Sequence, residues 1–368
     1  MYRDMETSEL AARLGMPDSP FLVDVREADE FAAWSIPSAV NIPVGELAAR
    51  IDEVATDREI VTVCASGSRS AVAAETLSRA GRHVANLAGG MEAWSGTYDS
   101  ITLELDDVRI VQVRRRGKGC LSYLVGSGDR AFVIDPSADV DVYRRLADEH
   151  GWVVARVFDT HLHADHLSGA RALAAATGAS LHLNPADTFD FPFEPVGDGD
   201  RFELPGGSGL TVAVLGTPGH TRGSTVYLVD GRAALTGDTL FVDSVGRPDL
   251  ADQAEAFAAD LFDSLHGKLL GLSDDLLVLP GHYGDGVVVR ADREVGAPLG
   301  QLRRELSALS FDRDAFVAWA AARSVDRPPN YTRIIEANMG RVSDPLAVLR
   351  QLEAGPNRCA VSSGAAPR

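Results

Sequence analysis

Cysteine, positive charge and long apolar runs are scarce in this chain. Only 3 of its 368 residues are cysteine, too few for a disulfide framework in a chain of this length. Lysine and arginine together number 35 against 53 aspartate and glutamate residues, which gives a formal net charge of -18. This charge argues against nucleic acid and anionic membranes as partners, because their phosphate groups would be repelled. No apolar run reaches the roughly 18 residues that a membrane span requires.

The first residues also lack the pattern of a secretory leader. They read MYRDMETSELAARLG, with acidic residues where a signal peptide has a basic stretch and then an apolar one. Together with the few cysteines, this predicts a cytoplasmic location, where thiols stay reduced. The composition, 45% hydrophobic and 24% charged, is that of a soluble globular protein. The sequence is compatible with a homo-oligomer.

The length favours two domains, and the pattern of apolar residues changes near residue 100. We expect an α/β domain over residues 1–98 and a second α/β domain over 99–350. Residues 96–100 are polar and turn-like and predict a linker. Residues 351–368 lack periodicity and predict a disordered tail.

The first domain alternates short apolar strands with helical patterns. Strands are predicted at Phe21–Val23 and Ile60–Val63, and a helix is predicted after Arg69. In that helix Ala73, Leu77 and Ala80 have the spacing of one buried face.

A cysteine-containing loop joins the strand that ends at Val63 to this helix. It reads Cys64-Ala65-Ser66-Gly67-Ser68-Arg69-Ser70. Loop N–H groups and the helix N-terminus would point at the sulfur, which stabilises a thiolate and makes Cys64 a nucleophile. Arg69 adds positive charge for an anionic sulfur donor, and Gly67 lets the loop close tightly. A buried, inert cysteine is the alternative that these surroundings disfavour.

Four segments of the first domain, in this order, resemble the rhodanese family. They are Asp24–Glu27, Ile36–Pro43, the Cys64–Arg69 loop and Asn86–Trp94. The resemblance implies that Cys64 carries a persulfide sulfur between donor and acceptor. Ala65 stands where many thiosulfate-using members have a basic residue, so a thiol persulfide is favoured as donor, with thiosulfate as a further candidate.

The second domain has histidines and aspartates at four separate strand ends. Imidazole and carboxylate together are the ligands that zinc or ferrous iron prefers. The predicted strands are Val153–Phe158, Leu210–Leu215, Ala233–Leu235 and Leu276–Leu279, and the residues that follow them are His161, His163, Asp165, His166, His220, Asp238 and His282. Cys120, which precedes a strand, is interpreted as a buried structural thiol.

This ligand pattern resembles the metallo-β-lactamase superfamily over roughly residues 102–350. The resemblance implies an αββα sandwich with the metal at one edge. The superfamily includes hydrolases with two metals and dioxygenases with one, and the ligand list does not separate them.

Three features favour the persulfide dioxygenase branch. The segment Thr239–Leu250 resembles that branch, in which Gly-Arg-x-Asp follows the metal aspartate. Arg327–Tyr331 and Asn338 resemble bacterial dioxygenase relatives. The rhodanese-like part supplies a chemical reason for the pairing, since one domain would make or consume the persulfide that the other oxidises.

The resemblance also implies roles for individual residues. His161, His220 and Asp238 would bind Fe(II) and leave positions open for the substrate sulfur and O₂, with sulfite and free thiol as products. The implied outer-shell or second-metal residues are His163, Asp165, His166 and His282. Arg247 and Asp249 would contact an anionic substrate, most simply glutathione persulfide; the alternative is an exposed turn arginine paired with Asp249.

Two other functions remain open at this point. One is a di-zinc thiolesterase of the glyoxalase II type. The other makes the rhodanese-like part a sulfur-carrying or docking module for a partner protein, although the presence of Cys64 favours catalysis.

Overall fold

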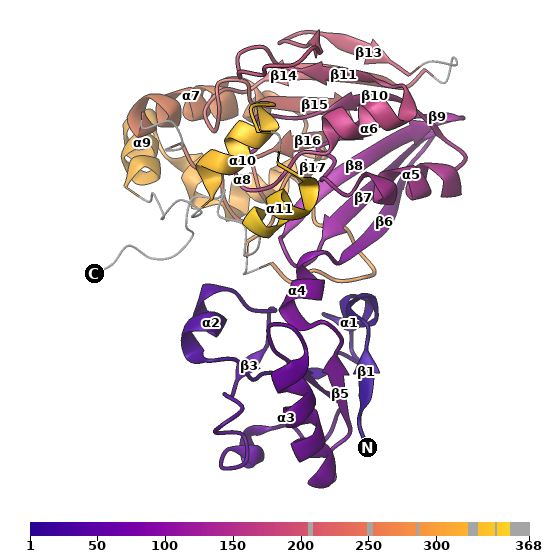
Figure 1. Cartoon of the computed structure of the whole chain (residues 1–368). Coiled ribbons are helices and arrows are strands. Elements are labelled where there is room, and N and C mark those ends of the chain that lie inside the picture. Colours follow the sequence, from indigo (N-terminus) through magenta and orange to yellow (C-terminus); the bar gives the residue numbers. More distant parts are fainter. Residues whose placement is uncertain (205–208, 249–252, 285–286, 323–329, 343, 354–368) are drawn as a thin grey trace.

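The chain folds into a smaller N-terminal unit and a larger unit (Figure 1). The computed structural model describes residues 1–368 except 205–208, 249–252, 285–286, 323–329, 343 and 354–368. Over these residues it contains a 5-stranded sheet, a 7-stranded sheet and a 6-stranded sheet. None of the described helices is both long and apolar enough to cross a membrane.

The N-terminal unit is built on the five-stranded sheet, in the order β1-β5-β4-β2-β3 with every pairing parallel. Its strands are β1 (Arg3–Met5), β2 (Phe21–Asp24), β3 (Val40–Asn41), β4 (Ile60–Val63) and β5 (Val84–Leu87). Its helices are α1 (Thr7–Arg13), α2 (Ala28–Ala33), η1 (Ile51–Glu53), α3 (Ser68–Arg79) and α4 (Gly90–Ser95). Side chains of α1 and α4 pack on one face and those of α3 on the other, as parallel sheets require.

The predicted helix after Arg69 corresponds to α3. Ala73 and Leu77 are fully buried against the sheet, as their spacing predicts. Ala80 is different: it is exposed and forms the C-cap of α3, so the buried face ends one turn earlier than expected.

The larger unit contains the other two sheets. The strands of the seven-stranded sheet are β6 (Tyr98–Leu105), β7 (Val108–Arg115), β8 (Cys120–Ser127), β9 (Arg130–Ile134), β10 (Val153–Phe158), β11 (Ser180–Leu183) and β12 (Glu194–Pro195). Those of the six-stranded sheet are β13 (Arg201–Glu203), β14 (Thr211–Gly216), β15 (Thr225–Val229), β16 (Ala233–Gly237), β17 (Leu277–Pro280) and β18 (Ala297–Pro298). The helices are α5 (Val140–Glu149), α6 (Ala170–Thr177), α7 (Ala254–Gly267), η2 (Leu269–Gly271), α8 (Leu299–Glu305), η3 (Ser307–Ser310), α9 (Arg313–Ala321), α10 (Tyr331–Asn338), α11 (Leu346–Arg350) and η4 (Gln351–Glu353).

The two sheets pack face to face between helices. One core cluster combines Ile110 and Tyr123 of the first sheet with Val212 and Tyr227 of the second, so it fills the space between them. Two further clusters lie under α5 and α6 on one outer face and under α7, α8 and α9 on the other. The αββα sandwich predicted from the sequence is therefore confirmed.

Two expectations about the segments that flank this sandwich need correction. Residues 98–100, expected in a linker, belong to β6, where they pair with Val113–Arg115 of β7. Glu353, expected in a disordered tail, is buried and accepts hydrogen bonds from Arg115 Nη1 (3.0 Å) and the backbone N–H of Leu167 (2.7 Å). The rest of the expected tail, residues 354–368, lies outside the described residues.

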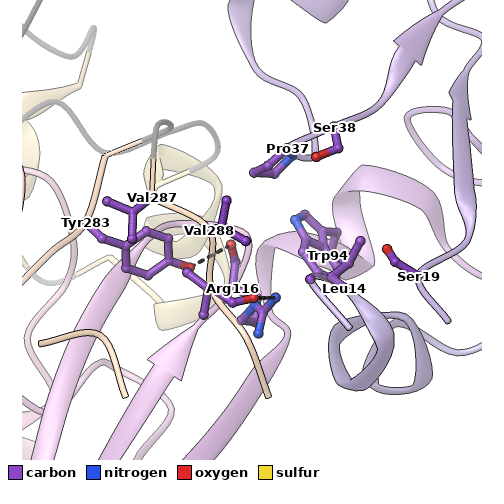
Figure 2. Close-up of a pocket in the computed structure, with 11 residues that line it drawn as sticks. Leu14, Ser19, Pro37, Ser38, Trp94, Arg116, Tyr283, Val287 and Val288 are labelled. Carbon is purple, nitrogen blue, oxygen red and sulfur yellow. Dashed lines mark hydrogen bonds between the residues drawn. The ribbon is translucent and has the colours of Figure 1, made fainter. Parts of the chain in front are cut away.

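The turn between β7 and β8 of the larger unit forms hydrogen bonds with the N-terminal unit. The indole N–H of Trp34 donates to the carbonyl of Gly117 (3.1 Å), and Arg115 Nε donates to the carbonyl of Ser95 at the end of α4 (2.9 Å). Beside the turn is a cavity of about 180 Å³. Figure 2 shows Pro37 and Trp94 of the N-terminal unit on one side of it and Tyr283 and Val288 of the larger unit on the other.

The turn predicts a stability effect at Gly117. A Cβ there would lie 2.3 Å from the carbonyl oxygen of Trp94, so Gly117→Ala forces the two units apart locally. We expect the free energy of unfolding to fall by roughly 1–3 kcal/mol. The matched control is Gly45→Ala, whose Cβ would have no atom within 4 Å and should change stability by less than about 0.5 kcal/mol. Denaturant unfolding measures both, and equal midpoints would contradict this account of the interface.

Candidate metal centre and cysteine site

The predicted metal ligands come from loops at the carboxyl ends of four strands. His161, His163, Asp165 and His166 lie between β10 and α6, and His220 lies between β14 and β15. Asp238 directly follows β16 and His282 follows β17, and these two strands pair in parallel. The carboxyl ends of the strands meet at one edge of the sandwich, so loops far apart in sequence converge there.

His161, His220 and Asp238 form one compact group of donor atoms. Their ligand atoms lie within 4.8 Å of one another, and all three side chains are buried. Asp238 Oδ2 is 3.7 Å from His161 Nε2 and 3.4 Å from His220 Nε2. None of these three atoms has a hydrogen-bond partner among the described residues. Because an unsatisfied buried polar atom is costly, the group fits a bound cation at the point where the three atoms converge.

The remaining polar atoms of this group have partners that fix its orientation. His220 Nδ1 donates to the carbonyl of Arg247 (2.9 Å), which leaves its Nε2 with a lone pair. His161 Nδ1 lies 2.9 Å from Thr160 Oγ1. Asp238 Oδ1 accepts from His282 Nδ1 (2.6 Å) and leaves Oδ2 free. Such outer partners orient metal ligands and raise their basicity.

The charge state of the group also suits a cation. Burial and the neighbouring His163 hold the pKa of His161 well below its usual value, and burial lowers the pKa of His220. Burial alone would raise the pKa of Asp238, but His282 and His161 hold it below its ordinary range. Two neutral imidazoles therefore face one ionised carboxylate at neutral pH, as metal binding requires.

A second group of donor atoms lies next to the first and contains Cys120. Cys120, Asp165, His166 and His282 are buried, and their ligand atoms lie within 4.8 Å of one another. The carboxylate of Asp165 is 3.1 Å from His166 Nδ1 and 2.9 Å from His282 Nε2. Since His282 also binds Asp238, it connects the two groups.

Cys120 is a buried thiol, as the sequence predicted, and it lies among these possible ligand atoms. It forms an isolated β-bridge with His282, and its Sγ lies 4.0 Å from Asp165 Oδ2. Burial opposes ionisation, but His166 and His282 lower the pKa of Cys120 to about 6. Nothing in the sequence indicated that Cys120 lies next to His282, because the two residues are far apart along the chain.

The ring of His163 lies between the two groups, with its centroid 4.2 Å from those of both His161 and His166. Its Nδ1 has no hydrogen-bond partner among the described residues, and its Nε2 points towards two aspartates. Its Nε2 lies 3.2 Å from Asp135 Oδ1 and 3.9 Å from Asp159 Oδ1. Asp135 also accepts from the backbone N–H and hydroxyl of Thr160, the residue before His161. The sequence analysis did not identify Asp135 or Asp159. Asp135 binds both Thr160 and His163 and so holds the ligand loop.

Asn338, one of the residues that carried the family resemblance, also binds the ligand loop. Its amide donates to the carbonyls of His163 (2.9 Å) and His166 (2.8 Å), and its oxygen accepts from the N–H of Ser168 (2.9 Å). Helix α10 is thereby fixed over the ligand loop. Of the accompanying Arg327–Tyr331 run, residues 327–329 lie outside the described residues.

The cysteine loop of the N-terminal unit has the predicted form. Cys64 is fully buried, and its Sγ accepts from the N–H of Gly67 (3.2 Å) and lies 3.3 Å from Ser70 Oγ. Burial raises the pKa of the thiol, but the Ser70 hydroxyl and the N–H groups of Ser70, Gly67 and Ser66 bring it below its usual value. Gly67 has φ of 97°, a left-handed conformation that favours glycine.

Arg69 differs from the expectation of an available cation. Both of its terminal nitrogens donate to the carboxylate of Glu30 on α2, at 2.7 and 2.8 Å. An anionic donor would have to displace Glu30 to bind Arg69, and the sequence analysis missed this partner.

Arg247 is likewise not the exposed turn residue of the alternative interpretation. It is only 1% exposed, and its carbonyl orients His220. Asp249, its expected companion, lies outside the described residues.

Comparisons with known proteins agree with this arrangement. Residues 6–97 match the rhodanese-like domain family, and residues 115–282 match the metallo-β-lactamase superfamily. An uncharacterized protein of Mycobacterium tuberculosis is 32% identical over 219 residues, which cover 50% of this chain and 95% of that protein. The crystal structure of ETHE1 from Myxococcus xanthus has 29% identity and a TM-score of 0.56, covering 62% of this chain and 97% of that chain.

A second class of relative is also similar to the larger unit. A hydroxyacylglutathione hydrolase of Methylobacillus flagellatus is 33% identical over 158 residues, which cover 43% of this chain and 57% of that enzyme. The family matches and the buried histidine and aspartate groups together imply a metal.

The three converging atoms predict a strong effect of removing the carboxylate. Asp238→Ala should weaken metal binding by more than the roughly 10–100-fold that loss of an outer-shell partner causes, because it removes a donor atom itself. Metal content and competition with a chelator measure the loss, while circular dichroism checks that the fold is retained. Asp198→Ala, at a partly exposed residue paired with Lys268, is the matched control. Unchanged affinity in Asp238→Ala would contradict the assignment of this group.

Proposed function

Because the chain belongs to the metallo-β-lactamase superfamily and carries a rhodanese-like domain before it, we propose that it is an Fe(II)-dependent persulfide dioxygenase with a sulfurtransferase module. The substrates are O₂ and a thiol persulfide such as glutathione persulfide, with thiosulfate as a further sulfur donor. The observation that carries the proposal is the group of three unsatisfied donor atoms on His161, His220 and Asp238.

Two imidazoles and one carboxylate on one side are typical of non-haem Fe(II) sites that activate O₂ and leave other coordination positions open. In the proposed enzyme His161, His220 and Asp238 would bind the iron. The protonated Nδ1 of His282 would donate a hydrogen bond to Asp238 Oδ1, which leaves Oδ2 available to the iron. The carbonyl of Arg247 would orient the imidazole of His220, and the hydroxyl of Thr160 would orient that of His161.

The overall reaction balances with one water molecule. A thiol persulfide, O₂ and water give the free thiol, sulfite and two protons. The sulfur–sulfur bond breaks, and the outer sulfur loses four electrons, which O₂ takes up. No further reductant is required.

The rhodanese-like module would supply or remove the outer sulfur. The Cys64 thiolate attacks the outer sulfur of the donor, and the donor's bond to that sulfur breaks. A thiolate acceptor then attacks the sulfur on Cys64 and releases the Cys64 thiolate. The N–H groups of Gly67 and neighbouring residues, together with Ser70, would stabilise negative charge on Cys64 in both steps.

Several further observations support the proposal. The likeness to ETHE1 covers most of that chain, and the Gly246-Arg247 segment resembles the dioxygenase branch. Arg247 is buried beside His220, as a residue of the site and not of the surface would be. We also propose a cytoplasmic location, since both cysteines among the described residues are free thiols.

A di-metal thiolesterase is the second candidate. The specific observation in its favour is the second donor group of Asp165, His166 and His282, which would hold a second metal. The likeness to a hydroxyacylglutathione hydrolase supports it too.

Metal content and oxygen uptake distinguish the two candidates. Protein purified without oxygen should contain about one iron per chain and should consume O₂ when glutathione persulfide is added, because the three-ligand group holds one Fe(II). Elemental analysis and an oxygen electrode make the measurement. Two zinc ions per chain, no oxygen uptake and hydrolysis of an acyl-glutathione would establish the thiolesterase in its place.

Replacement of the nucleophile should separate the two activities. Cys64→Ser keeps the volume but cannot carry a transferable sulfur, and it leaves the ligands from His161 onward unchanged. Oxygen uptake with preformed glutathione persulfide should persist, whereas uptake driven by thiosulfate plus glutathione should vanish. Cys359→Ser is the matched control. Loss of both activities in folded, iron-loaded Cys64→Ser would mean that the persulfide must pass through Cys64.

A further inference from the structure

A cavity of about 230 Å³ opens beside the proposed metal ligands. His220 and the ligand-loop residues Leu162 and Ala164 form its inner wall, and Phe257, Ile335 and Met339 complete an apolar lining. Sites that enclose a whole ligand of drug size usually measure roughly 300–1,000 Å³. The cavity therefore has room for the sulfur-bearing arm of a thiol, and the rest of the molecule would remain at its mouth.

Arg222 is the cation among the residues that line this cavity. It is exposed, and over the described part of the chain it makes no side-chain hydrogen bond or ion pair. Two arginines close in sequence to the lining residues Ile335 and Met339 have acidic partners: Arg333 is paired with Asp344 and Arg341 with Asp190. In a chain with a net charge of -18, an arginine with no acidic partner at a cavity mouth is available to an anionic ligand.

The carboxylate of Asp187, which also lines the cavity, is hydrogen-bonded elsewhere and forms no ion pair with Arg222. Its two oxygens accept from the N–H of Leu162 (2.8 Å), the N–H of Gly223 (2.9 Å) and the hydroxyl of Thr221 (2.9 Å). The bonds from the Thr221 hydroxyl and the Gly223 N–H anchor the two neighbours of Arg222. The arginine is therefore held at the mouth of the cavity, two residues from His220.

We propose that Arg222 determines which thiol carrier the enzyme accepts: a thiol with a carboxylate a few bonds from its sulfur. This inference rests on the proposed persulfide chemistry and names the substrate class for the same site. The apolar lining takes the carbon atoms next to the sulfur, and Arg222 binds the anionic group by charge-assisted hydrogen bonds. Arg247, the cation that the sequence suggested for this role, is buried and does not line the cavity.

A pair of substrates that differ by one carboxylate tests the proposal. N-acetylcysteine persulfide carries a carboxylate that N-acetylcysteamine persulfide lacks. The wild type should show a lower KM for the anionic persulfide, and Arg222→Gln should reduce this preference, measured as the ratio of the two KM values, by roughly 5–20-fold. Arg222→Lys should restore much of it, and Arg201→Gln, at an exposed arginine that does not line the cavity, is the matched control. An unchanged ratio in Arg222→Gln would overturn the proposal.

A binding measurement keeps this test independent of the proposed function. Titration calorimetry with S-methyl-N-acetylcysteine and S-methyl-N-acetylcysteamine, which are not oxidised as persulfides, measures affinity for the metal-loaded protein. Arg222→Gln should weaken binding of S-methyl-N-acetylcysteine by roughly 5–20-fold and leave binding of S-methyl-N-acetylcysteamine, which has no carboxylate, unchanged. Equal affinities in wild type and Arg222→Gln, or no binding by the wild type, overturn the role of Arg222. Absence of oxygen uptake by the wild type with every persulfide would instead overturn the proposed function.

Discussion

Three buried atoms, His161 Nε2, His220 Nε2 and Asp238 Oδ2, converge on one point without a hydrogen-bond partner among the described residues. In a closed interior such atoms cost free energy unless a cation satisfies them. Much of the larger unit serves to keep them converging. Four strands end at the same edge, His282 and the Arg247 carbonyl occupy the other polar atoms of Asp238 and His220, and Asn338 holds the ligand loop in place.

The two sites of the chain are joined by a short run of direct contacts. The N–H groups of Met91 and Glu92 in α4 donate to the carbonyls of Cys64 and Ala65, and the carbonyl at the end of α4 accepts from Arg115. The turn that follows Arg115 leads to Cys120, which is bridged to His282. The cysteine loop and the metal centre are therefore both fixed to the turn end of the β7–β8 hairpin, where Arg115 and Cys120 are paired.

The arginines near the two sites differ in whether they have an acidic partner. Arg69 beside Cys64 is bound by Glu30, and Arg247 near the metal centre is buried. Arg222, at the mouth of the cavity that reaches His220, makes no ion pair among the described residues. In the proposed enzyme, selection of an anionic substrate would therefore depend on which arginines lack an acidic partner, and not on how many arginines there are.

Local patterns in the sequence determined the strands before each ligand loop and the Cys64 loop, because these depend on alternation of apolar residues and on neighbours a few positions apart. The αββα class followed from the resemblance of the ligand pattern to a known superfamily. Tertiary structure alone decided which atoms meet. The approach of Cys120 to His282, the pairing of Arg69 with Glu30 and the burial of Glu353 against Arg115 join residues far apart in sequence, which no local pattern records. The resemblance separated the roles of His161 and His163, but only the structure shows what each ring nitrogen meets. Asp135 binds His163 Nε2, while His161 Nε2 faces Asp238.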